Sequence, residues 1–151
     1  YFGISKNNGT NYTSYGIPGG SYFYENVTGL TYGTNIIIAK AVSDNQQTNQ
    51  SMPVTIVYDN IQPSLYVESP TNGEIVSSEI VVKGTTQDQY GISGVYVALD
   101  SFSTYYPASL DGTNWSRSFS GLSTGGHYLR VFARDIAGNS SSTNFINITN
   151  W

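Results

Sequence analysis

The feature that most constrains the fold of this chain is an internal repeat. Residues of the second half match residues of the first half at a constant offset of 92, which is the length of a small domain rather than of a solenoid unit. The matched pairs are Phe23 with Trp115, Leu30 with Leu122, Ile37 with Leu129, Ala39 with Val131, Ala41 with Ala133, Val54 with Ile146 and Ile56 with Ile148. The chain of 151 residues is therefore expected to hold two related small domains.

The stretch 125–139 is the clearest repeated element. Residues 128–134 alternate with period two, which puts Leu129, Val131 and Ala133 on one face of a predicted strand. Two glycines precede this strand, and the sequence Asp-Ile-Ala-Gly-Asn at 135–139 follows it as a predicted turn. What recurs at the offset of 92 is the inward face, so the stretch is expected to define a fold rather than an active centre.

Short alternating segments with turn residues between them cover the rest of the chain. Strands are predicted at 1–5, 21–27, 35–42, 54–58, 64–69, 79–84, 95–99, 115–119 and 143–149. Aromatic residues reach 14% with 13 Tyr, and few windows are rich in strong helix formers. These features predict an all-β fold of antiparallel sandwiches, with Trp115 in the core of the second copy.

The repeat also predicts where the domains lie. Residues 1–59 correspond to the C-terminal part of one copy, residues 60–63 form a short linker stiffened by Pro63, and residues 64–151 form a complete copy. The first copy lacks roughly thirty residues at its front, which would supply two opening strands. Three explanations stay open: the residues precede Tyr1 in the parent protein, another chain donates a strand, or the first copy is a shorter variant.

Charge and cysteine content exclude several classes of function. The net charge is −4, with six Lys and Arg against ten Asp and Glu, so the chain has no basic surface for nucleic acid. The absence of Cys excludes disulfides and zinc-thiolate sites. No apolar stretch is long enough to predict membrane insertion. The low charge and the abundance of Tyr, Asn, Thr and Ser favour an exported protein.

Several motifs in the second copy resemble those of bacterial Ig-like domains, which occur in tandem in secreted and cell-surface proteins. The matching residues lie at 69–73, 82–85, 88, 91–95, 111–112, 115, 122, 126–127 and 133–139. In the first copy the match is looser, and Ser43-Asp44-Asn45 replaces the start of the turn at 135–139. The resemblance implies an extracellular or cell-surface spacer, stalk or adhesion module, or an accessory domain beside an enzyme elsewhere in the parent protein.

Calcium is the one metal for which the sequence offers candidate ligands. The linker residues Asp59 and Asn60 could combine with the loop residues Asp88 and Asp135 to supply oxygens to a hard cation. The alternative is that each Asp caps its own turn, because no EF-hand spacing is present. No other cofactor is expected.

Aromatic and arginine side chains provide a candidate ligand-binding face. Tyr128, Arg130, Phe132 and Arg134 lie on the outward phase of the strand at 128–134, and Tyr96 is expected on a neighbouring outward row. Such a row could stack on sugar rings or bind a host surface protein. The alternative is that these side chains pack against one another on a solvated sheet.

Catalysis is not expected. His127 is the only His, and the neighbouring sequence offers it neither a nucleophile nor an acidic partner. We therefore predict a non-catalytic module whose partners are adjacent domains or subunits of the same protein. The alternative is a module that binds a carbohydrate or host ligand through its outward aromatic residues.

Overall fold

The computed structural model describes residues 1–15 and 24–151. The chain divides into two compact units, Tyr1–Asp59 (unit 1) and Asn60–Trp151 (unit 2). The described residues form strands, turns and loops but no helices, which confirms the prediction of an all-β fold. Accordingly, no helix in this part of the chain could cross a membrane.

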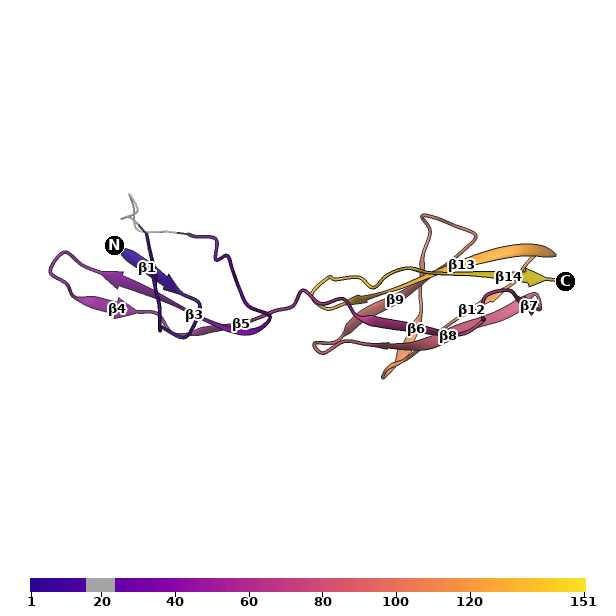
Figure 1. Cartoon of the computed structure of the whole chain (residues 1–151), viewed down its shortest axis with the longest axis horizontal. Helices are drawn as coiled ribbons and strands as arrows, with labels where there is room; N and C mark the ends of the chain where they lie inside the picture. Colours follow the sequence, from indigo (N-terminus) through magenta and orange to yellow (C-terminus); the bar gives the residue numbers. More distant parts are fainter. Residues whose placement is uncertain (16–23) are drawn as a thin grey trace. The chain divides into compact units, whose positions relative to one another are not determined.

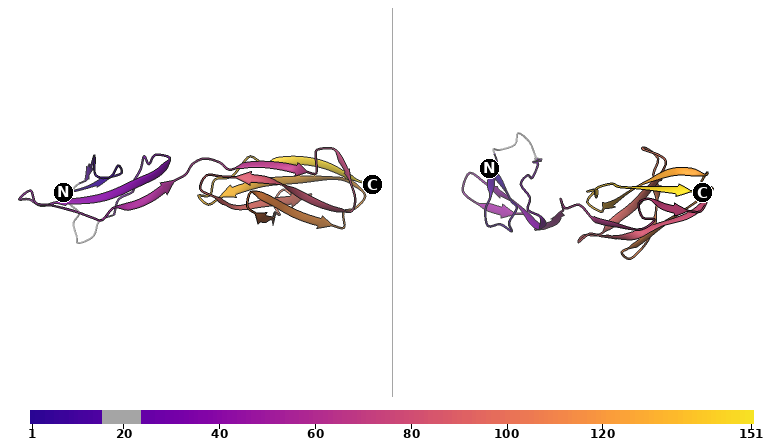
Figure 2. Two further views of the ribbon diagram at one scale, coloured as in Figure 1. Left: turned by 90° about the horizontal axis from the view of Figure 1, so that it is seen from below. Right: turned by 45° about the vertical axis from the view of Figure 1, so that its right-hand side comes forward.

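Unit 2 is a sandwich of two sheets (Figure 1; Figure 2, right). Its strands are β6 (Ser64–Ser69), β7 (Glu74–Val76), β8 (Glu79–Gln87), β9 (Ile92–Leu99), β10 (Tyr106–Pro107), β11 (Ser109–Asp111), β12 (Asn114–Ser120), β13 (Gly125–Asp135) and β14 (Asn144–Asn150). One sheet has the order β10-β9-β13-β14-β7 and the other β11-β12-β8-β6. All pairs are antiparallel except β14 with β7, which run parallel.

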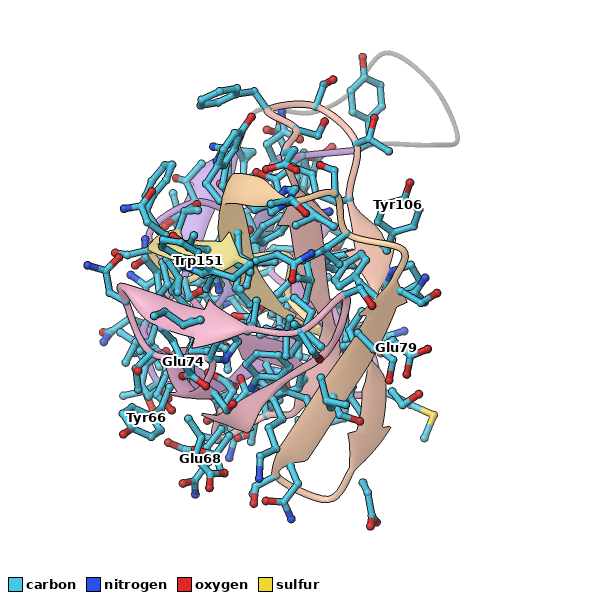
Figure 3. All side chains as sticks on the ribbon, turned by 90° about the vertical axis from the view of Figure 1, so that its right-hand side faces the viewer. Tyr66, Glu68, Glu74, Glu79, Tyr106 and Trp151 are labelled. Carbon is cyan, nitrogen blue, oxygen red and sulfur yellow. The ribbon has the colours of Figure 1, made fainter. Side chains whose placement is uncertain are left out.

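The core of unit 2 lies between the two sheets and consists of their inward residues. It contains Ile80, Val82, Val95, Val97, Trp115, Leu122, Leu129, Val131, Ala133, Ile146 and Ile148. The period-two pattern places these side chains inward because successive residues of a strand point to opposite faces. Outward residues extend into solvent, as Tyr66 and Glu68 of β6 do in Figure 3.

Unit 1 consists of one described sheet. Its strands are β1 (Phe2–Ser5), β2 (Thr13–Tyr15), β3 (Gly33–Val42), β4 (Thr48–Gln50) and β5 (Val54–Tyr58). The order is β2-β1-β3-β4, and β5 pairs with the other half of β3. The turn before β2 contains Asn8 and Gly9, both with positive φ, as the Asn-Gly pair predicts.

Two expectations for unit 1 need correction. The predicted strand at 21–27 lies partly outside the described residues, and its remaining part, 24–27, forms no strand. The inward residues predicted for β3 are not a closed core either: Ile37 and Ala39 are half-buried and Ala41 is exposed, whereas Ile38 and Val42 on the opposite phase are buried. The described part of unit 1 has no second sheet that could pair with residues 24–27 or cover Ile37, Ala39 and Ala41.

Candidate functional site

Asp135 sits at the end of β13, where its carboxylate holds the following turn together. Its Oδ1 accepts the backbone N–H groups of Gly138 and Asn139 at 2.6 and 2.8 Å, and its Oδ2 accepts the side-chain amide of Asn139 at 2.8 Å. Asp135 is 1% exposed. The bonded N–H groups lie three and four residues on, and they fix the orientation of a buried carboxylate.

Asp88 approaches the same end of unit 2 from another loop. It follows β8, and its Oδ1 accepts the backbone N–H of Tyr90 at 2.8 Å. The backbone N–H of Ile136 donates to the Gly91 carbonyl at 3.1 Å, which ties this loop to the turn that Asp135 organises. The capping predicted for Asp88 and Asp135 is therefore present in both turns.

A third carboxylate, Asp59, joins these two. One ligand oxygen from each of Asp59, Asp88 and Asp135 lies within 4.8 Å of the others. Asp59 and Asp88 are half-buried, and the fourth predicted ligand, Asn60, is exposed. Among the described residues, neither Asp88 nor Asp135 forms an ion pair.

The chemistry of this carboxylate cluster suits a hard cation. Carboxylates whose oxygens lie within 4.8 Å of one another repel when charged, and a bound cation would reverse that repulsion. Calcium takes six to eight oxygen ligands with flexible geometry, and carboxylates are among the ligands it prefers. Calcium binding by these three aspartates stays a prediction.

The predicted aromatic face is largely packed against itself. Phe132 stacks on Tyr96 with 5.1 Å between ring centroids, and Tyr105 meets the Phe132 ring edge-on at 5.0 Å. Tyr128 contacts Phe102 at 5.2 Å. The segment between β9 and β10 thus folds over the outward face of its own sheet, so these rings use much of their area on one another.

Arg130 lies among three aromatic rings on this face. Its guanidinium carbon is 4.9, 5.6 and 5.1 Å from the ring centroids of Phe102, Tyr105 and Phe145, and its Nη1 donates to the Phe102 carbonyl at 2.9 Å. Arg134, by contrast, is exposed. Sequence reasoning missed Phe102, Tyr105 and Phe145, although the Tyr-rich connection at 100–108 was the available signal. Phe102 and Phe145 remain 72% and 59% exposed.

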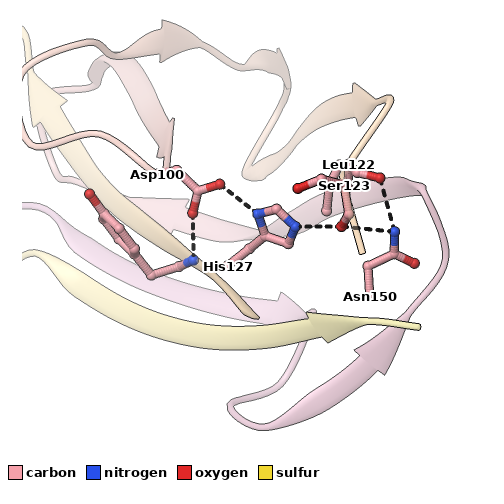
Figure 4. Close-up of polar contacts among 6 residues, drawn as sticks. Asp100, Leu122, Ser123, His127 and Asn150 are labelled. Atoms are coloured by element: carbon pink, nitrogen blue, oxygen red, sulfur yellow. Dashed lines mark hydrogen bonds and ion pairs between the residues drawn. The ribbon is translucent and has the colours of Figure 1, made fainter. Parts of the chain in front are cut away.

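His127 has an acidic partner that its neighbours in the sequence do not provide. This partner is Asp100, which directly follows β9 (Figure 4). Its Nδ1 lies 2.5 Å from Asp100 Oδ2, and its Nε2 lies 2.8 Å from the Ser123 carbonyl oxygen. Both neighbours are hydrogen-bond acceptors, so both ring nitrogens donate when the imidazole is protonated. The Ser123 carbonyl and then the Asp100 carboxylate raise the pKa of His127 above its usual 6.5, against the opposing effect of burial.

The same network closes one end of unit 2. The second oxygen of Asp100 accepts the Tyr128 backbone N–H at 2.9 Å, and the Asn150 side-chain amide donates to the carbonyls of Leu122 and Ser123 at 2.9 and 3.1 Å. Ser123 takes part through its main-chain carbonyl and not its hydroxyl. The Asp-His pair therefore lacks the nucleophile of a catalytic triad and instead joins three segments.

Unit 1 has a counterpart of this network at the repeat offset. Asn35 occupies the position of His127, and its Nδ2 donates to the carbonyl of Thr31, the counterpart of Ser123, at 2.8 Å. Its Oδ1 accepts the Thr31 backbone N–H at 3.0 Å. The role of tying the preceding loop to the strand thus recurs with a neutral side chain in place of a charged one.

Comparison with known proteins identifies what the chain resembles. No protein-family profile matches it. Bacillopeptidase F of Bacillus subtilis (strain 168) is 30% identical over 114 residues, which are 75% of this chain and 7% of that protein. The chain therefore spans a small fraction of this relative's length.

Among solved structures, the fibronectin(III)-like modules of CbhA from Clostridium thermocellum superpose with a TM-score of 0.59 at 18% identity. The superposition covers 99% of this chain and 76% of that one. At this level of identity the likeness concerns the fold. The chain therefore has the Ig-like, fibronectin(III)-like β-sandwich fold that its motifs implied.

Proposed function

We propose that this chain is a non-catalytic structural or adhesion module, a spacer or stalk within a larger bacterial protein that is secreted or displayed on the cell surface. One observation on unit 2 supports the proposal: its first strand, β6, begins at one end of the sandwich, and its last strand, β14, finishes at the opposite end. Ser64 pairs with Gln87 beside the Asp88 loop, whereas Asn150 pairs with Gly125 at the far end of β13 from Asp135.

This path suits a module that works in series. A strand as long as β13, with its 11 residues, spans about 35 Å, so each such unit lengthens a stalk by about that much. Force applied at the two ends of unit 2 acts along β6 and β14. It therefore loads the hydrogen bonds between β6 and β8 together rather than one after another.

The relatives support the same setting. Bacillopeptidase F is far longer than the matched region, and the CbhA structures are of modules. A domain carried within a larger exported protein would have adjacent domains or subunits as its immediate partners.

Single-molecule pulling tests the proposed role. The chain has no Cys, so two introduced cysteines, kept reduced until the handles are attached, define the pulling points. Ser64→Cys with Trp151→Cys loads unit 2 end to end, and Ser64→Cys with Gln87→Cys unzips β6 from β8 as the matched control. We expect the end-to-end geometry to need the higher unfolding force. Equal forces would argue against a mechanical role.

The calcium site is part of this proposal. A cation held by Asp59, Asp88 and Asp135 would fix the end of unit 2 at which its chain begins, which a load-bearing module needs. The support is the convergence of three carboxylates from distant parts of the sequence.

A carbohydrate- or host-ligand-binding module is the second candidate. It is favoured by the exposed rings of Phe102 and Phe145 on either side of Arg130, rather than by the packed rings of Tyr96, Tyr128 and Phe132. Binding on a glycan array that is lost in Phe102→Ala with Phe145→Ala, and kept in the exposed control Ile75→Ala, would support it. Absence of binding would leave the structural role.

A further inference from the structure

The outward face of the sheet formed by β9, β13 and β14 carries two arginines and no unpaired carboxylate from its own strands. Arg130 and Arg134 lie on the outward row of β13, and β9 and β14 contain no Asp or Glu. The one acid of β13, Asp135, is buried, and Asp100, which follows β9, bonds to His127. Unit 2 as a whole has seven Asp and Glu against four Lys and Arg. Positive charge is therefore concentrated on one face of a unit that is acidic overall.

Arg130 is held in place, but its charge has no ionic partner. Its half-buried side chain lies among the rings of Phe102, Tyr105 and Phe145, and its Nη1 donates to the Phe102 carbonyl. In the part of the chain that the structure describes, Arg130 forms no ion pair and its Nη2 forms no hydrogen bond. A guanidinium that is already oriented loses little freedom when it binds an anion. Arg130 is thus an oriented cation with donors left for a ligand.

Exposed aromatic rings accompany this cation. Phe145 lies directly opposite Arg130 in the pairing of β13 with β14, and Phe102 reaches it from the segment that follows β9. Both rings keep more than half of their surface exposed. The apolar C–H face of a sugar ring packs well on a flat aromatic ring. The face therefore combines stacking surfaces with an unpaired positive charge.

We propose that this face binds an acidic polysaccharide, in which a hexuronic acid residue places its carboxylate on Arg130 Nη2 and its ring on Phe102 or Phe145. Charge-assisted hydrogen bonds of this kind are the strong ones in proteins. Arg134 lies four residues further along β13, at about 13 Å, and can meet a second carboxylate of an extended polymer. The inference rests on the second candidate function, carbohydrate binding, and adds the chemical class of the ligand. It does not depend on the mechanical role of unit 2.

Each acidic polymer, compared with its own methyl ester, tests whether the carboxylate is recognised. The full chain is titrated calorimetrically with polygalacturonate, alginate and hyaluronate, and with the same polymers after methyl esterification. We expect at least one acidic polymer to bind, and its ester to bind at least about tenfold more weakly because a charge-assisted hydrogen bond is lost. Poly-L-glutamate supplies carboxylates without sugar rings and should also bind at least about tenfold more weakly.

Variants of the chain test whether this face is the one that binds. Arg130→Gln should weaken binding of the acidic polymer by at least about tenfold, and Arg134→Gln by a smaller factor. Lys83→Gln in β8 of the other sheet removes the same charge and should leave binding unchanged. Thermal melts check that Arg130→Gln folds. Arg134 is exposed, so its variant gives a second readout that does not depend on packing.

Four results would overturn the proposal. Absence of binding to every polymer of the panel would do so and would leave the mechanical role standing. Equal binding of an acidic polymer and its ester would do so while keeping the second candidate function, because a neutral carbohydrate would then suffice. Equally tight binding of poly-L-glutamate would point to an acidic peptide instead. An equal loss in Lys83→Gln would mean that binding follows net charge and not this face.

Discussion

Strands β3 and β13 occupy the same place in their two units, yet only β13 lies in a closed core. Leu129, Val131 and Ala133 of β13 are fully buried, while Ile37 and Ala39 of β3 are half-buried and Ala41 is exposed. In β3 the buried apolar residues are instead Ile38 and Val42, which lie on the opposite phase and are each 7% exposed. The matched phase is therefore buried only where a second sheet covers it.

The largest difference that we expect between the two units comes from truncating the side chains of one matched pair of residues. Leu129→Ala should destabilise unit 2 by about 3–4 kcal/mol because it leaves a cavity in a closed core. Ile37→Ala, at the matched position, should cost about 1 kcal/mol or less because solvent already reaches that face. Denaturant unfolding followed by the fluorescence of buried Trp115 measures the first, and hydrogen exchange in β3 the second. Equal losses would mean that unit 1 has a closed core after all.

Calcium binding is the second effect that we expect to distinguish unit 2 from unit 1. Two of the three clustered carboxylates, Asp88 and Asp135, belong to unit 2, whereas unit 1 has Ser43 where unit 2 has Asp135. At calcium a hundredfold above its Kd, we expect unit 2 to gain about 2.7 kcal/mol over the chain in EDTA. Thermal melts should show this gain in the wild type and in the control Asp111→Asn, but not in Asp88→Asn. A midpoint that EDTA leaves unchanged would remove the calcium site.

The sequence predicted the strands and core residues better than the contacts between side chains. Period-two patterns placed Trp115, Leu129 and Ile148 in the core, because such patterns depend on local geometry alone. The partners of His127 and Arg130 could not be read in the same way. Asp100 and Phe102 lie 27 and 28 residues earlier and reach them only through the pairing of β9 with β13.

The carboxylate cluster was partly predictable because it depends on where strands end and not on which side chains face each other across a sheet. Asp59, Asp88 and Asp135 each stand at the end of a strand or beside the linker, and the ends of paired strands meet at one end of a sandwich. Residues 24–27, however, belong to the strand predicted at 21–27 and form none. The described part of unit 1 holds no strand that pairs with them, and the sequence of a strand does not show whether its partner is present.

Glycine substitutions should sharpen the comparison with a smaller effect. A Cβ at Gly84 in β8 would lie 1.9 Å from the Tyr66 carbonyl oxygen and 3.0 Å from Trp115, so Gly84→Ala should cost unit 2 about 1–3 kcal/mol. At Gly3 in β1 the nearest atoms would lie 3.3 Å away, and Gly3→Ala should change the stability of unit 1 by less than about 1 kcal/mol. Chemical denaturation and hydrogen exchange provide the two readouts. A neutral Gly84→Ala would show that β6 and β12 can move apart at little cost.

The smallest effect should be a pH dependence that only unit 2 shows. The folded pKa of His127 lies above its unfolded value of 6.5, so the stabilisation from its charged form is complete below pH 6.5 and is lost as the pH rises through the folded pKa. Asn35, at the matched position of unit 1, binds the equivalent carbonyl without a titrating group. Melts between pH 5.5 and 8.5 should therefore show unit 2 losing stability towards high pH in the wild type and less so in His127→Gln. Exchange in β3 of unit 1 should follow only the intrinsic pH dependence of amides. If His127→Gln lost as much stability over this range as the wild type, the charged His127 would not be what holds the Asp100 and Ser123 segments to β13.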